Sequence, residues 1–225
     1  MGRVIIKEDT IKNPITMIGK YAGTCWGANT TDDNKNYNRG LDCLKSKHGR
    51  TWEFPDIYME IDGYSARVMR EWYTHIGGAP TRLQASTRYI NYKDFKYVVP
   101  NSVSKVEEAK DIFVDVMNYI SNGMDKLEKL GIPREDIAMM LPFTMSTKVV
   151  CKHNFRNIAD MSHQRMCTRA YWEYRELFND LRKALSDYSE EWKYLVDNYL
   201  VPKCEVYGFC EEKDTCKRKP KKENA

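Results

Sequence analysis

The stretch WYTHIGGAPTRLQASTRYINY, from Trp72 to Tyr92, constrains the fold and function of this chain more than any other. A Gly-Gly-Ala-Pro turn at residues 77–80 is followed by a run of polar side chains, with only Leu83 and Ala85 between them. Such a run is poor material for a hydrophobic core. Its arginines, amide and hydroxyls are instead suited to binding an anion and a planar, hydrogen-bonding ring.

Length and composition place this stretch in one large domain or two small ones. The chain has 225 residues, of which 42% are hydrophobic and 12% aromatic, and this is enough to form a packed core. Its start lacks the apolar segment of a secretion signal, and no run approaches the roughly 18 consecutive apolar residues of a membrane span. We therefore expect a cytoplasmic protein with no membrane partner.

Cysteine and charge patterns argue against several classes of site. The seven cysteines, without a secretion signal, indicate reduced thiols rather than a disulfide framework. The net charge of +4 comes from residues 213–225, which hold six Lys or Arg against two acids, so no nucleic-acid surface is expected. Cys204, Cys210 and Cys216 recur at six-residue steps, whereas zinc ligands typically pair across two to four residues. We interpret them as thiols of a surface-lying tail and expect no metal site.

Periodicity and capping residues predict an α/β or α+β fold with one sheet. Strands are predicted at residues 4–6, 57–61, 97–99 and 143–151. Helices are predicted at residues 14–25, 41–46, 65–75, 133–140, 154–185 and 188–199, with a loop at 27–40. A long amphipathic helix is predicted to open at a capping box of Ser104 and Glu107 and to end at Gly131.

Standard catalytic signatures are absent from the sequence. Gly77-Gly78 matches neither a phosphate loop nor a dinucleotide fingerprint, and neither Gly-x-Ser-x-Gly nor His-Glu-x-x-His occurs. A second polar group lies in the helix predicted from Asn154, and comprises Arg156, Asp160, His163, Gln164, Arg165 and Arg169. By spacing alone it fits an exposed helix with ordinary ion pairs. Its interleaved apolar residues indicate that at least one arginine faces a ligand or a subunit boundary.

Together these segments resemble the flavin-dependent thymidylate synthases. The motifs that carry the resemblance are REWYTH at residues 70–75, STRY at 86–89, Asn154-Phe-Arg156 and Arg165, in the family's order over most of the chain. The resemblance implies a thymidylate synthase-complementing-protein-like single domain, with a mixed or antiparallel sheet flanked by long helices. We expect this domain to occupy residues 1–201, followed by a Cys-bearing basic tail at 202–225.

The resemblance implies a specific reaction, the reductive methylation of deoxyuridine monophosphate (dUMP) at C5 to give dTMP. It implies FAD as the cofactor, NADPH as its reductant, methylenetetrahydrofolate as the one-carbon donor, and a homotetramer whose flavin sites are shared between subunits. The flavin performs the hydride chemistry while the protein supplies positioning and electrostatics. This suits a sequence without an obvious catalytic thiol or triad.

The resemblance also assigns the site residues. Arg165 matches an arginine that faces a uracil carbonyl, where a fixed cation favours loss of the N3 proton and stabilises the anionic ring. The implied nucleotide-binding positions are Glu71, Thr74, Gln84, Ala85, Ser86, Thr87, Arg88 and Arg165. The implied flavin-binding positions are Arg50, Glu53, Thr74, His75, Ile76, Gln84, Asn154, Arg156 and Asp160. Arg82 is added to them as a candidate of this chain's own.

The chain departs from the family pattern around this site. The family's Arg-His-Arg triplet, which helps hold the flavin, reads Thr74-His75-Ile76 here. The other departures are Glu71 for glutamine, Gln84 for glutamate, Ala138 for arginine and Asp160 for asparagine. Charge-assisted contacts contribute about 1.5–3 kcal/mol each. We therefore hypothesise that Arg82, in a lengthened loop, replaces one of the missing arginines, with Arg169 or Arg50 as further candidates.

Other functions remain open at this point. The altered nucleotide loop permits a related flavin and folate enzyme that acts on another uridine nucleotide or releases a hydroxymethyl product. The missing arginines permit a non-catalytic protein that binds a nucleotide or flavin. A nucleic-acid-binding protein that uses the basic tail is the least favoured alternative.

Overall fold

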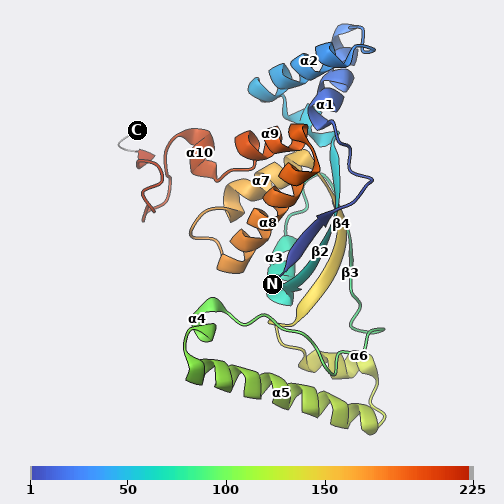
Figure 1. Ribbon diagram of the computed structural model, residues 1–225, viewed down its shortest axis with the longest axis vertical. Coiled ribbons are helices and arrows are strands. Elements are labelled where there is room, and N and C mark those ends of the chain that lie inside the picture. Colours follow the sequence, from blue (N-terminus) through green and yellow to red (C-terminus); the bar gives the residue numbers. More distant parts are fainter. Residues whose placement is uncertain (1, 223–225) are drawn as a thin grey trace. The chain divides into compact units, whose positions relative to one another are not determined.

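The computed structural model describes residues 2–222 (Figure 1). Its contacts divide them into two compact units whose segments alternate along the sequence. The first unit comprises residues 2–3, 61–74 and 83–149, and the second comprises residues 4–60, 75–82 and 150–222. Met1 and residues 223–225 of the predicted tail lie outside the described residues. The boundary expected between residues 201 and 202 stays a prediction.

Four strands form one sheet in the order β1-β2-β4-β3. Their bounds are β1 Arg3–Ile6, β2 Asp56–Ser65, β3 Thr81–Gln84 and β4 Ser146–Asn154. Within the first unit, Asp62 of β2 pairs with Arg3 at 2.9 Å and with Lys148 at 3.7 Å. Within the second unit, Glu60 pairs with Lys7 at 2.8 Å and Asp56 with Lys152 at 3.2 Å. Along both β1 and β4, the residue numbers of the paired side chains increase as the numbers of their partners on β2 decrease. β1 and β4 therefore run antiparallel to β2.

The first unit packs its helices over a methionine-rich core. Its elements are α3 Ala66–Trp72, α4 Asn101–Ser104, α5 Glu107–Lys129, α6 Arg134–Ile137 and the 3-10 turn η3 Ala138–Met140. The buried core cluster consists of Phe95, Met117, Met124, Ile137 and Met145. The capping box predicted from Ser104 and Glu107 is wrong, because the Ser104 hydroxyl donates to the Asn101 carbonyl at 3.1 Å and Val106 precedes α5 without a side-chain cap. The predicted end is confirmed, since α5 stops before Gly131, whose φ is +78°.

The second unit is mainly helical. Its elements are α1 Pro14–Ala22, η1 Gly23–Trp26, α2 Asp33–Lys45, η2 Gly49–Glu53, α7 Phe155–Arg165, α8 Trp172–Tyr188, α9 Glu190–Tyr199 and α10 Lys203–Tyr207. Fully buried aromatic rings, among them Phe155, Tyr174, Phe178 and Trp192, form much of its core. Between residues 2 and 222, no helix has the length and apolar character needed to cross a bilayer.

Two expected elements of this unit are corrected by the structure. Residues 33–40, predicted as loop, belong to α2, which Asp32 caps by accepting a hydrogen bond from the Lys35 amide at 3.1 Å. α2 packs closely on α1, because a Cβ at Gly40 would overlap the Ile15 carbonyl. The single helix predicted at 154–185 is two helices, and the chain between Arg165 and Trp172 leaves Arg169 outside both. Arg169 pairs instead with Glu212 at 3.2 Å.

The α/β architecture with one antiparallel sheet is confirmed. β3 was not predicted, because its residues, Thr81 to Gln84, are polar and mostly exposed and lack an apolar alternation. Residues 97–99, predicted as a strand, form only an isolated bridge between Tyr97 and Met145.

Candidate functional site

The polar loop at residues 84–88 lies in the first unit and is anchored to β4 at its start. The Gln84 side-chain amide donates to the Thr147 hydroxyl at 3.3 Å, and the Ala85 amide donates to the Lys148 carbonyl at 2.9 Å. The Ser86 hydroxyl accepts a hydrogen bond from the Arg88 amide at 3.1 Å. These bonds fix the loop backbone and leave the side chains of Thr87 and Arg88 exposed. Such a loop suits a ligand that carries a phosphate.

Arg88 already has an anionic partner in this conformation. Its Nε lies 2.9 Å from a carboxylate oxygen of Glu135, and both side chains are more than half exposed. Exposed ion pairs of this kind contribute about 0–1 kcal/mol, so a bidentate phosphate could exchange with Glu135 at little cost. Upstream in the same unit, the Thr74 hydroxyl donates to the Glu71 carbonyl at 2.7 Å, which closes the last turn of α3.

A cation that the sequence reasoning missed lies near this loop. A small cavity of the first unit is lined by Thr87 of the loop, Arg134 of α6 and Ala138, among others. Arg134 stands one helical turn before Ala138, the position where the family resemblance expects an arginine. Its Nε lies 3.6 Å from Glu128. Arg134 lies four residues before Ala138, and residues at this spacing lie on the same face of a helix. This spacing could have indicated Arg134 as a replacement for the arginine missing at position 138.

In the second unit, His75 and Arg165 meet although they are far apart in sequence. Arg165 Nε donates to His75 Nε2 at 3.0 Å, and the guanidinium carbon stands 4.9 Å from the centre of the Tyr174 ring. The His75 ring meets Tyr174 edge-on, with centroids 6.3 Å apart. Arg82 Nη2 donates to the His75 carbonyl. The structure therefore gathers His75, Arg82 and Arg165 into one cationic cluster backed by an aromatic ring.

The electrostatics of this cluster keep His75 uncharged. Burial, together with the charges of Arg165 and Arg82, lowers the pKa of His75 to about 4. A neutral imidazole can accept at Nε2 only when its proton is on Nδ1, which is the tautomer that the bond from Arg165 requires. Near neutral pH, His75 is thus an uncharged hydrogen-bond acceptor for Arg165.

The Gly77-Gly78 turn lies against the start of α7. Asn154 caps this helix by accepting a hydrogen bond from the Asn157 amide at 2.8 Å, and His153 Nδ1 lies 2.6 Å from the Asn157 side-chain oxygen. A Cβ at Gly78 would collide with the Asn154 side chain, and Gly78 has a φ of +70°. The turn therefore needs glycine for both its backbone conformation and its close approach to α7.

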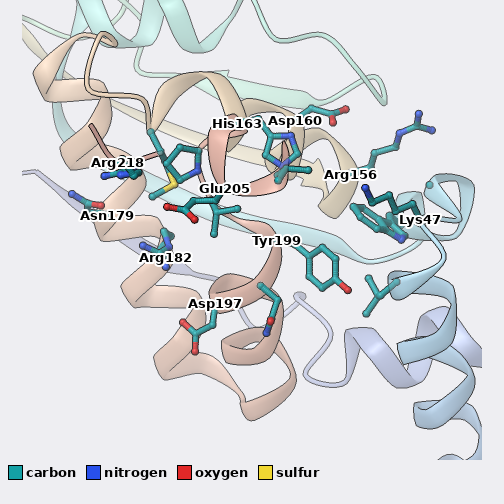
Figure 2. A pocket seen from close by; sticks show the side chains of 18 of the residues that line it. Lys47, Arg156, Asp160, His163, Asn179, Arg182, Asp197, Tyr199, Glu205 and Arg218 are labelled. Carbon is teal, nitrogen blue, oxygen red and sulfur yellow. The ribbon is translucent and has the colours of Figure 1, made fainter. Parts of the chain in front are cut away.

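α7 presents a polar face to a cavity of about 1120 Å3 in the second unit (Figure 2). Arg156, Asp160 and His163 follow one another at i, i+4 and i+7, so they share the face that lines the cavity. Arg156 Nη1 lies 2.7 Å from Glu53, which also faces Arg50 at 4.0 Å. Four of the residues implied for flavin binding are thus close together: Arg50, Glu53, Arg156 and Asp160.

The remaining walls of this cavity carry more cations than acids. The cations include Lys47, Arg182 and Arg218, and the acids include Asp197 and Glu205 (Figure 2). Arg175 is a further cation of the lining. The Trp52 ring meets Tyr199 edge-on at 5.1 Å, which gives the cavity an aromatic wall. Trp52 Nε1 and Arg182 Nε are buried and have no hydrogen-bond partner in the described part of the chain. Buried donors without partners are unusual, so these atoms fit a bound group that supplies acceptors.

The predicted site residues therefore fall into three groups. The loop at residues 84–88 and the pair Glu71 and Thr74 belong to the first unit. The cluster around His75 and the face of α7 belong to the second unit, with Asn154 at the start of α7. Ile76 is 74% exposed and offers only its backbone to a polar ligand.

Comparison with known proteins identifies relatives over most of the chain. The family profile described as Thymidylate synthase complementing protein matches residues 7–188. A flavin-dependent thymidylate synthase of Clostridium tetani is 30% identical, covering 94% of this chain and 92% of the relative. That of Pyrococcus furiosus is 26% identical, covering 74% and 69%. The structure of thymidylate synthase X from Helicobacter pylori with FAD and dUMP matches with a TM-score of 0.70 at 19% identity, covering 89% of this chain and 99% of that one, which shows a shared fold.

Proposed function

This chain belongs to the family of flavin-dependent thymidylate synthases, and we propose that it methylates dUMP at C5 with methylenetetrahydrofolate as carbon donor and NADPH as reductant. The family resemblance expected from the sequence is confirmed, as is its consequence that the protein is a flavin-dependent enzyme. The nucleotide, the folate and NADPH, and the roles of individual residues, are the proposal.

The observation that carries the proposal is the position of Arg165. Its guanidinium is positioned by the hydrogen bond to His75 and by the Tyr174 ring. A fixed cation opposite a uracil carbonyl would lower the pKa of the ring N3–H and stabilise the resulting anion. The anionic ring is more nucleophilic at C5, which is the atom that is methylated. Arg165 would accordingly act by electrostatic stabilisation, without forming a covalent bond.

The nucleotide phosphate is assigned to the loop at residues 84–88. The Ser86 hydroxyl, the exposed Thr87 backbone and the Arg88 guanidinium offer the donors that a phosphate needs, once Arg88 leaves Glu135. Arg134 of α6 lines the cavity beside Thr87 and would add a second cation. These residues would bind and orient the substrate rather than take part in proton transfer.

FAD is assigned to the cavity on the polar face of α7. Arg156, Arg182 and Arg218 would balance its pyrophosphate, and Trp52 and Tyr199 would contact its rings. The partnerless donors on Trp52 and Arg182 support this assignment. When bound, reduced flavin supplies the hydride that completes the methyl group. Asn154 and His153 would hold α7 in place rather than touch the reacting atoms.

A homotetramer and a cytoplasmic location remain part of the proposal. The apolar side chains Ile112, Val116 and Tyr119 on α5 are exposed by 59%, 49% and 81%. They are spaced at i, i+4 and i+7, so they form one apolar stripe on the helix. An exposed apolar stripe of this kind supports contact with another copy of the chain.

A reconstituted reaction tests the proposal. The purified protein, FAD, NADPH, methylenetetrahydrofolate and dUMP are incubated without oxygen, and the nucleotide is analysed by mass spectrometry. The expected product carries one added methylene unit, and Arg165→Ala should abolish it while Arg169→Ala should retain it. A hydroxymethyl product, or turnover of a different uridine nucleotide only, would support the related-enzyme alternative. Flavin binding without any nucleotide product would support a non-catalytic protein.

A further inference from the structure

A second cavity in the second unit, of about 380 Å3, is lined by four of the seven cysteines. They are Cys167, Cys204, Cys210 and Cys216. Cys167 follows the end of α7, Cys204 lies on α10, and the other two follow α10. Cys25, Cys43 and Cys151 are not part of the lining, and none of the seven cysteines forms a disulfide bond within residues 2–222. Two separate segments of the chain, one after α7 and the other from α10 onward, therefore bring four thiols to one cavity.

The backbone around this cavity is held by several contacts. The Cys210 amide donates to the Pro220 carbonyl at 2.7 Å, and the Lys222 amide donates to the Cys210 carbonyl at 3.2 Å. Arg169, next to the α7 end, pairs with Glu212 at 3.2 Å, and Lys203 pairs with Glu211. The segment after α10 thus folds back beside Cys167 instead of extending away from the unit.

We propose that this cavity is a structural zinc site whose ligands are the thiolates of Cys167, Cys204, Cys210 and Cys216. Four cysteine sulfurs in tetrahedral arrangement are a common ligand set for Zn2+. Binding replaces four S–H protons with four Zn–S bonds and releases the protons to solvent, and nothing is oxidised or reduced. The inference does not depend on the reaction proposed above.

The charges beside the cavity suit a zinc tetrathiolate, which carries two negative charges. Arg218 lines the cavity and makes no ion pair with a carboxylate within residues 2–222. Its cation would partly offset the charge of the site.

The side chains must rotate to complete the site. In the described residues, no three His, Cys, Asp or Glu side chains are already grouped as ion ligands. Cys210 is buried at 9% exposure, whereas Cys216 is exposed and turned toward Thr168 and Arg218. Zinc would draw Cys216 inward and close the tail over the cavity. Because Cys167 comes two residues after Arg165, the metal would also hold the end of α7.

The sequence spacing alone does not reveal this site. The three tail cysteines have five residues between neighbours, which is wider than the usual zinc-ligand pair. The fourth ligand comes from a segment far upstream. Only the folded chain brings Cys167 to the same cavity as the tail cysteines, so the proposed joint site could not be inferred from spacing.

The metal content of the full-length protein tests the proposal. The protein is purified under reducing conditions from cells grown with added zinc, and zinc is measured by plasma mass spectrometry. We expect about one zinc per chain. Each of Cys167→Ser, Cys204→Ser, Cys210→Ser and Cys216→Ser should lower zinc retention after dialysis at least tenfold. The matched control Cys25→Ser, which changes an exposed thiol outside the cavity, should retain it.

A second measurement covers variants that fail to fold. Zinc is removed from the wild-type protein by a chelator, and Co2+ is added while the absorption spectrum is recorded. Thiolate-to-cobalt charge-transfer absorption, lost on adding zinc, is the expected result. Absence of both zinc and this absorption would overturn the proposal. So would iron with acid-labile sulfide, or disulfide bonds among these four cysteines in the metal-free mass spectrum.

Discussion

Arg165 donates from Nε to Nε2 of His75 across 3.0 Å, which joins the end of α7 to a histidine two residues before the Gly77-Gly78 turn. A histidine that accepts from an arginine must be neutral, and burial with two nearby arginines lowers the pKa of His75 to about 4. His75 therefore positions the cation without cancelling its charge. In the family pattern this histidine stands between two arginines, and here it is the only member of that triplet that remains.

Replacing His75 should reduce turnover by misplacing Arg165. A hydrogen bond to a charged group contributes about 1.5–3 kcal/mol, so His75→Ala should lower kcat by about 10- to 100-fold. His75→Gln, whose side-chain oxygen can accept from Arg165, should recover part of the loss. Steady-state assays of nucleotide methylation measure both. Equal losses in the two variants would contradict a positioning role.

Removing Arg82 should weaken binding of the flavin or the nucleotide. Arg82 donates to the His75 carbonyl and lies in the same cationic cluster, where it would replace one of the missing triplet arginines. Loss of a charge-assisted contact should raise the dissociation constant about 10- to 100-fold in Arg82→Ala. Flavin fluorescence titration and equilibrium dialysis of dUMP measure the two affinities. Arg82→Lys, which keeps the charge, should lose less. Unchanged affinities in Arg82→Ala would rule out the replacement.

The start of α7 was predictable from local sequence. Asn154 is a favoured N-cap residue, and Arg156 and Asp160 share one helix face because of their i, i+4 spacing. The end of this helix was not predictable. No glycine or proline occurs between Arg165 and Trp172, so the sequence pattern predicted one continuous helix there. The structure has a break between α7 and α8 at this point.

Long-range contacts explain what else the sequence did not reveal. α2 is predominantly polar, and its N-cap at Asp32 was hidden among other turn-forming residues. Cys167 becomes a candidate only when folding brings it to the tail cysteines. Folding also places Arg134 beside Thr87, although its i, i+4 spacing from Ala138 was already visible in the sequence. Local sequence patterns thus predicted where many helices and strands lie and which side chains share a helix face. Which residues each face contacts became known only from the structure.

Neutralising Glu135 should strengthen nucleotide binding. Glu135 holds Arg88 at 2.9 Å and so competes with a phosphate for the same guanidinium. Exposed ion pairs contribute about 0.2–1 kcal/mol, so Glu135→Gln should lower the dissociation constant for dUMP about two- to fivefold. Calorimetric titration measures this constant. The control Glu108→Gln removes an exposed acid of α5 and should have no effect. Weaker binding in Glu135→Gln would show that Glu135 assists the nucleotide.

A side chain at Gly78 should destabilise the second unit. Gly78→Ala places a Cβ on a residue with φ of +70° and against the Asn154 amide. The backbone cost alone is about 1–2 kcal/mol, and the collision should raise the loss to about 3 kcal/mol. The control Gly27→Ala has a φ of +58° but no atom within 4 Å of the new Cβ, so it should show the backbone cost alone. Urea unfolding measures both. Equal losses would mean that Asn154 moves aside freely.

Acid should destabilise the fold through His153, which is fully buried. Burial is the main cause that lowers its pKa to about 4; the charges of Arg82 and His75 act in the same direction, and the Asn157 hydrogen bond opposes them. The unfolded histidine has a pKa near 6.5, so between pH 6.5 and 4 the unfolded chain binds the additional proton. The stabilisation is therefore complete above about pH 6.5 and is lost as the pH falls toward 4, by on the order of 3 kcal/mol.

Urea unfolding at a series of pH values measures how the free energy of unfolding changes with pH. His153→Gln can keep a hydrogen bond to Asn157 but cannot titrate. The free energy of unfolding of this variant should therefore fall less steeply as the pH is lowered. Part of the remaining pH dependence should come from His75, whose pKa is also lowered. An unchanged slope would show that His153 is not the group that takes up the proton.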